Sequence, residues 1–229
     1  MNKTLKVILE IVLAIAAVFC VYLIYSSVMK PVRFNKEKEA RQAVAVQRLK
    51  DIRTLQVAFK GVTGHFTESV DSLVDFYNNG KMDITMQIGS NDDSLAVANT
   101  ARIKKKNRKI TNEQLLELYN QGEKLVFSVT TPMPVKDTLF LGREDFCIDS
   151  LKTIPYSGGY PVQMEAIVKS VSGVQVPLFE ARMPWKAILM GMDYQLIVNL
   201  DAECERQNRY EGLQVGSVSA PNNNAGNWE

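Results

Sequence analysis

The sequence has little of the chemistry that enzymes and metal proteins use. It holds one histidine, His65, and three cysteines, with no CxxC pair and no HExxH motif, so a standard zinc site has no ligand set. The glycine pair in "SGGYP" lacks the strand and helix context of a phosphate-binding loop, and no Ser or Cys nucleophile stands in a recognisable motif with His65. These absences predict a chain that is not an enzyme, with no catalytic residue, metal or cofactor.

The chain also lacks an excess of charge of either sign. Its 27 Lys and Arg residues nearly balance its 25 Asp and Glu residues, which leaves a formal net charge of +2. A protein that binds nucleic acid through its overall field has a strongly basic balance. We therefore expect no nucleic-acid partner, and any partner has to be recognised by a local surface.

The most prominent feature that is present is the apolar run "VILEIVLAIAAVFCVYLIYSSVM" at residues 7–29. As a helix it reaches about 34 Å, which matches a hydrocarbon core about 30 Å thick with some tilt. A cleavable signal has a shorter apolar region that ends in small residues, and lipidation of Cys20 is rejected because bulky Phe19 precedes it. The run predicts a transmembrane helix at 7–29, preceded by a short cytoplasmic tail at 1–6, and membrane lipid as the first partner.

One carboxylate, Glu10, lies near the front edge of this run, beside Lys6. Both are predicted at the membrane interface, where they can pair or extend toward water. Basic residues flank the run on both sides, and their count alone places the body inside the cell, but long domains translocate largely regardless of charge. We predict a single-pass protein of a bacterial inner membrane with a periplasmic C-terminal domain; a cytoplasmic tethering protein is the alternative.

Residues 30–61 are predicted to form a stalk helix after Pro31, which is expected to kink or interrupt the helix. Apolar residues recur at three- and four-residue steps, and Gly61 and Gly64 provide stop signals. This stripe either packs onto the chain's own body or binds a partner, because an isolated helix that leaves a membrane cannot leave it in contact with water. The predicted partner-binding residues are Leu49, Ile52, Leu55 and Phe59.

The remaining residues predict a small body of helices followed by strands. Residues 62–122 are expected to be mainly helical, with "HFTESVDSLVDFYNNGK" capped by Thr67 or Ser69. Residues 123–220 are expected to be β-rich: "SVSG" forms a hairpin turn between strands at 162–169 and 174–182, and "DYQLIVNL" is either a strand or part of a helix. Residues 221–229 are predicted as an exposed tail, with Trp228 as a docking residue.

Together these segments predict an α+β fold in which an N-terminal transmembrane helix and a long stalk helix lead to a small antiparallel-sheet body. Two cysteines of the body, Cys147 and Cys204, are candidates for a disulfide, because the periplasm is oxidising. Such a bond could contribute about 4 kcal/mol by restricting the unfolded chain. The alternative is two separate buried thiols.

The stretch "VILEIVLAIAAV", followed by a long polar helix, resembles the N-terminal arm of type IV pilins and type II secretion pseudopilins. In those families a glutamate helps subunits assemble after cleavage at a glycine. Leu5 stands where that glycine belongs, so the assembly role is not carried over to Glu10. Through "RFNKEKEARQAVAVQRLKDIRTLQVAFK" and "SAPNNNAGNWE" the chain also resembles single-pass membrane proteins of Bacteroidetes-type bacteria, which implies a membrane-anchored build and no particular activity.

The resemblance to pilin stalks implies a non-catalytic, inner-membrane-anchored structural or binding component of a bacterial envelope assembly, of pilus or secretion type. Its expected partners are other envelope proteins, bound through the stalk helix, and further copies of the chain. The alternative is a membrane-tethered enzyme or ligand sensor with a periplasmic domain.

Overall fold

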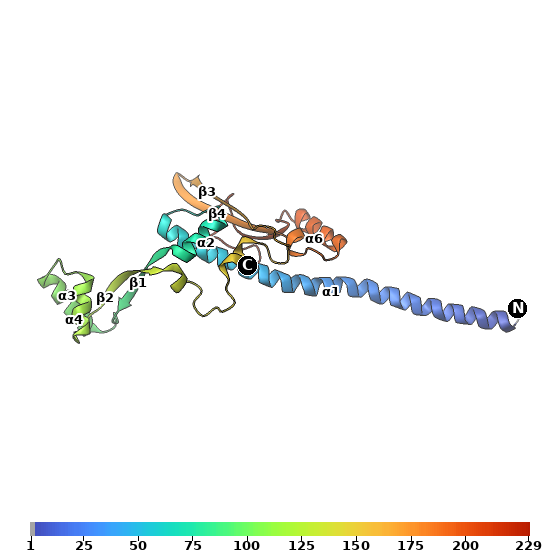
Figure 1. Cartoon of the computed structure of the whole chain (residues 1–229), viewed down its shortest axis with the longest axis horizontal. Helices are drawn as coiled ribbons and strands as arrows, with labels where there is room; N and C mark the ends of the chain where they lie inside the picture. The colour runs from blue at the N-terminus through green and yellow to red at the C-terminus, as the bar shows by residue number, and fades with distance from the viewer. Residues whose placement is uncertain (1–2) are drawn as a thin grey trace.

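The computed structural model describes the backbone of residues 3–229 and the side chains of residues 11–229, and a single long helix, α1 (Lys3–Thr63), dominates it (Figure 1). Pro31, at which the sequence allows a kink or an interruption that need not end the helix, lies inside α1 and does not end it. A proline removes one backbone hydrogen bond, and a helix of 61 residues retains its other bonds on both sides. The span and the stalk are therefore one continuous rod.

The two halves of α1 have different surroundings. Ile11 to Val28 are almost entirely exposed, and this part has a mean hydropathy of 2.5, which makes it the one helix among the described residues that is long and apolar enough to cross a membrane. From Phe34 onward the helix is embedded in the body, where Phe34, Ala45 and Leu49 belong to the main hydrophobic core. The chain thus has the predicted α+β build, with a membrane-type helix leading to a small antiparallel-sheet body.

The main core lies between the second half of α1 and a three-stranded antiparallel sheet. The sheet has the order β3 (Gln163–Val171), β4 (Val174–Pro184), β5 (Gly212–Gly216). The predicted hairpin turn is confirmed: Ser172 and Gly173 both have positive φ angles, 52° and 83°, as a two-residue turn between twisted strands requires. Phe179, Ala181 and Met183 of β4 supply fully buried side chains to the core.

Short helices close the ends of this core. Helix α2 (Val70–Asn79) begins at Ser69, whose side chain accepts a hydrogen bond from the Ser72 N–H, as predicted. α5 (Trp185–Ile188) follows β4 directly, and α6 (Tyr194–Arg206) begins at Asp193, which caps it. The strand interpretation of "DYQLIVNL" is therefore wrong and the helical alternative is correct, because this cap and the half-buried Leu196 and Leu200 favour the 3.6-residue period.

An arm extends from the body on the side away from the N-terminus (Figure 1). Its base is a two-stranded antiparallel ribbon of β1 (Lys81–Ile88) and β2 (Phe127–Pro134), and its tip holds α3 (Ser94–Lys106) and α4 (Asn112–Asn120). The tip has a small core of its own, formed by Leu115, Leu125 and Phe127. Residues 62–122 are therefore not simply helical, because they contain all of β1.

Two further segments attach to α1. The loop between the short helices η1 (Val135–Asp137) and η2 (Ile148–Lys152) is fixed by Arg143, whose Nη1 donates to Asp51 Oδ1 at 2.5 Å. Residues 221–229, here called the tail segment, lie against β5, where Gly226 forms a β-bridge with Val215. Trp228 packs against the main core, as predicted, but the segment as a whole is docked and not a free exposed tail.

Candidate binding groove

The apolar stripe of the stalk does not face a partner. Leu49, Ile52 and Leu55 are 0% exposed and belong to the main core, so the prediction that they bind a partner is wrong. Phe59 is half-buried, with its ring edge-on to Phe76 at a centroid distance of 5.3 Å. The stripe is covered by the chain's own sheet and helices, because α1 packs against β4, β5 and α5.

The other predicted site residues do not form a site in the described part of the chain. The side chains of Lys6 and Glu10 lie outside the described residues, so their placement at a membrane interface stays a prediction. Cys147 is an exposed free thiol in the loop before η2, and Cys204 is a half-buried free thiol on α6. The predicted disulfide is not formed, and the alternative of two buried thiols fails as well, since only Cys204 packs against the core.

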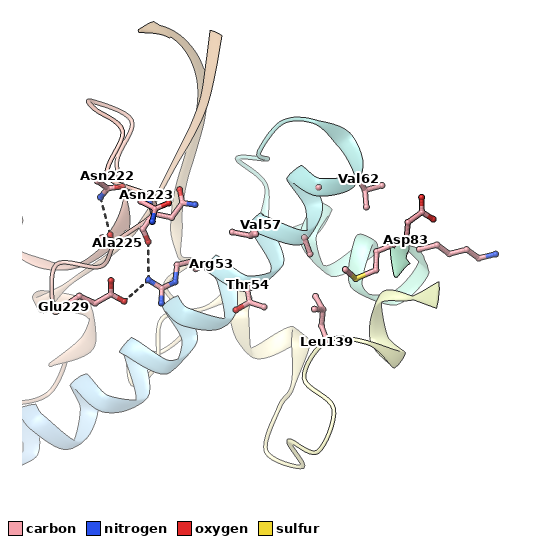
Figure 2. A pocket seen from close by; sticks show the side chains of 15 residues that line it. Arg53, Thr54, Val57, Val62, Asp83, Leu139, Asn222, Asn223, Ala225 and Glu229 are labelled. Carbon is pink, nitrogen blue, oxygen red and sulfur yellow. Dashed lines mark hydrogen bonds and ion pairs between the residues drawn. The ribbon is translucent and has the colours of Figure 1, made fainter. Parts of the chain in front are cut away.

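The surface of α1 that the body leaves open is the floor of a groove with a volume of about 1240 Å³ (Figure 2). Val57 and Val62 of α1 line it and are 50% and 51% exposed. The tail segment borders the groove at one place and the start of β1 at another, with Leu139 completing the apolar part of the lining. The groove thus combines aliphatic side chains on a helix with polar borders.

Arg53 holds the border that the tail segment provides. Its Nη1 donates to Glu229 Oε1 at 2.7 Å and to the Asn224 carbonyl at 3.3 Å (Figure 2). Glu229 also accepts from the Gly226 N–H at 3.3 Å, which closes the segment on itself. Asn223 and Asn224 have φ angles of 55° and 58°, a left-handed conformation that asparagine tolerates better than most residues. These contacts keep the tail segment beside α1.

This border is expected to open in acid. The hydrogen bond from Arg53 lowers the pKa of Glu229 below its ordinary value of 4.5. A carboxyl group whose pKa is lowered by folding stabilises the docked state above the unfolded pKa, and this contribution is lost as the pH falls through the lowered folded pKa. We expect the ¹⁹F signal of labelled Trp228 to shift in that range below 4.5, while the signal of buried Trp185 stays in place.

The variant Glu229→Gln is the control, because it lacks the titrating group. Its Trp228 signal should be independent of pH in the same range. A parent protein that behaves like this variant would contradict the assignment of the tail's docking to the Arg53–Glu229 pair.

The border at β1 has a different character. Lys81 and Asp83 are exposed there, while Met82 between them is half-buried. The sequence alone pointed to none of these groups, because the groove is assembled from α1, β1, the loop at Leu139 and the tail segment. A signal for one wall was nevertheless present, since "KMDITMQI" alternates polar and apolar residues over its whole length.

The groove's lining combines aliphatic side chains with basic, acidic and amide side chains. No histidine or cysteine lines it, and the described residues 11–229 contain no cluster of three or more His, Cys, Asp or Glu side chains that could hold a metal ion. His65, outside the groove, is exposed and has its Nδ1 3.1 Å from the Thr63 carbonyl oxygen. The comparisons of this chain with protein-family models, curated proteins and solved structures give no match. The groove and helix α1 are therefore the features that bear on its function.

Proposed function

We propose that the chain is a non-catalytic, single-pass, membrane-anchored binding component of a bacterial envelope assembly, and that it binds its partner in the groove on α1. The observation that carries this proposal is the unbroken helix, which joins an apolar span to a body with an open, mixed apolar and polar groove. Val57 follows Met29, the last residue of the apolar run, by 28 residues, or about 42 Å along a helix. The groove is thus held at a fixed distance from the membrane.

The compartment is part of the same proposal. We infer an inner-membrane anchor with a periplasmic body, since a domain of this length translocates largely regardless of the charges that flank the span. Phe34 is already buried in the main core and follows Met29 by only five residues. The body therefore begins close to the headgroup region, as expected of a component that works at a membrane surface.

The build supports a role similar to that of pilus or secretion components, with one change from the expected contact. The stalk stripe is occupied by the body, so assembly with envelope proteins or further copies has to use another surface. The groove is favoured because Val57 and Val62, two half-exposed aliphatic side chains of α1, line the same groove as Leu139. Of the two carboxylates in its lining, Glu229 is paired with Arg53 and Asp83 is exposed to solvent, which favours binding over a membrane-tethered enzyme.

Site-specific photo-crosslinking in the native host tests the groove. A photoreactive amino acid at Val57 is expected to give a crosslinked partner protein, because this position faces the open groove. The matched control is Val44, which is also exposed on α1 but does not line the groove. Crosslinks of equal yield at both positions, or none at Val57, would overturn the proposal.

A further inference from the structure

The strand β1 is open on one edge. It pairs only with β2, in a sheet of two strands. The hydrogen bond from the Val135 N–H to the Gly80 carbonyl, at 3.0 Å, sets the pattern of the ladder, so the even-numbered residues of β1 bond to β2. The backbone N–H and C=O groups of Lys81, Asp83, Thr85 and Gln87 therefore point away from β2. Among the described residues these groups have no backbone hydrogen-bond partner outside the ribbon.

The opposite edge of the same ribbon is closed. Pro132 and Pro134 of β2 lie opposite Asp83 and Lys81. At both positions the backbone nitrogen faces the outer edge of β2, and proline has no N–H to donate to another strand there. Prolines on an outer edge are one way in which proteins prevent unwanted strand pairing. β1 contains neither proline nor glycine, so this protection is confined to one side of the ribbon.

The side chains of β1 define what kind of strand fits beside it. Met82, Ile84 and Met86 share one face, and Met86 is 58% exposed. Lys81, Asp83 and Thr85 share the other face, which is polar and exposed. A strand that pairs with β1 places its own side chains in the same two layers, so a fitting segment alternates apolar and polar residues. The flexible methionines can adapt to different apolar side chains.

We propose that β1 binds an extended segment of a partner protein as an added strand, antiparallel or parallel, with an alternating apolar and polar sequence. This inference rests on the proposed function and adds the mode of recognition, because Lys81, Met82 and Asp83 also line the groove. Strand addition obtains its affinity from main-chain hydrogen bonds and its specificity from alternate side chains. The segment enters along the groove and pairs with the free edge.

A second copy of this chain is a poorer occupant than a foreign segment. β1 runs from the body toward the tip of the arm, away from the anchor (Figure 1). A two-fold symmetric pair of edge strands is antiparallel, which would direct the two anchors in opposite directions. Two copies in one membrane cannot meet this condition, so the structure favours a different protein as the source of the strand.

A proline at Thr85 tests the proposal, because it removes an outward N–H without touching the β1–β2 ladder. The matched control is Thr130→Pro in β2, which lies directly opposite. The Oγ1 atoms of Thr85 and Thr130 are 2.9 Å apart, so both variants lose the same side-chain hydrogen bond and differ only in the edge that they block. The probe is a displayed library of random octapeptides, selected on the full chain in lipid nanodiscs.

We expect selected octapeptides to lose affinity for Thr85→Pro by about tenfold or more, because a backbone hydrogen bond is lost and the ring obstructs the edge. Their affinity for Thr130→Pro should stay close to that of the parent. Gln87→Pro replaces Thr85→Pro if the latter does not fold. A library without binders, or equal affinities for both variants, overturns the inference.

The remaining outcomes are also decisive. Mass photometry that shows a dimer of the parent, dissolved by Thr85→Pro, overturns the foreign segment in favour of a second copy. Photo-crosslinks at Val57 that persist in Thr85→Pro leave the proposed function standing and remove only the strand-addition mode. Loss of crosslinks at Val57 in Thr85→Pro, with crosslinks retained in Thr130→Pro, supports both the proposed function and the strand-addition mode.

Discussion

Replacing Ile52 by lysine is expected to unfold the body. Ile52 is 0% exposed and belongs to the main core, where the new ammonium group would be buried among apolar side chains such as Leu49 and Leu55. A buried charge without a partner costs more than about 4 kcal/mol, which is comparable with the whole stability of a domain of ordinary size. Urea denaturation followed by near-ultraviolet circular dichroism measures the loss.

The control for this substitution is Val57→Lys, five residues further along the same helix. Val57 is half-exposed, so its lysine reaches water and should change the free energy of unfolding by less than about 0.5 kcal/mol. If Ile52→Lys leaves the body folded and removes partners instead, the stripe is an interface and the packing of α1 against the sheet is wrong.

Replacing Arg143 by methionine is expected to destabilise the body by about 3 kcal/mol. Arg143 donates to Asp51, which is only 5% exposed, and the ion pair fixes the loop before η2 against α1. Without the guanidinium, Asp51 keeps a hydrogen bond of 3.0 Å from Gln47 but remains a buried charge without a counterion. The Asp51 hydrogen bond is also the main reason why the pKa of Arg143 is raised.

A double-mutant cycle isolates this interaction. Asp51→Asn combined with Arg143→Met should recover much of the lost stability, since the buried charge is then absent. Arg206→Met is the control, because its pair with Glu203 is largely exposed and should be worth less than about 1 kcal/mol. An Arg143→Met variant as stable as Arg206→Met would show that the loop does not depend on the ion pair.

The sequence predicts the local elements of this fold better than it predicts their neighbours. Ser69 predicts the start of α2 and "SVSG" predicts the β3–β4 hairpin, because caps and two-residue turns depend on a few adjacent residues. The periodicity of α1 correctly identifies an apolar face at Leu49, Ile52 and Leu55. It cannot identify what covers that face, because the covering sheet comes from residues 163–216, more than a hundred positions later.

Two features that the sequence did not reveal, β1 and the groove, were hidden for physical reasons. β1 was missed although it alternates throughout, because helical signals precede and follow it within 62–122. The groove could not be predicted, since Arg53, Leu139 and Glu229 become neighbours only after the loop and the tail segment dock on α1. Periodicity gives the exposed or buried side of one element, whereas a groove depends on how separate elements meet.

Because α1 is continuous, a tilt of its apolar half moves the body with it. No joint separates the span from the groove, so any tilt of the helix within the bilayer is passed on to the body as a rigid movement. A tilt of about 20°, which is common for membrane helices, displaces a point about 42 Å from the membrane sideways by about 14 Å. In the proposed membrane-anchored protein, lipid thickness and neighbouring helices would therefore set how far the groove reaches sideways from the anchor.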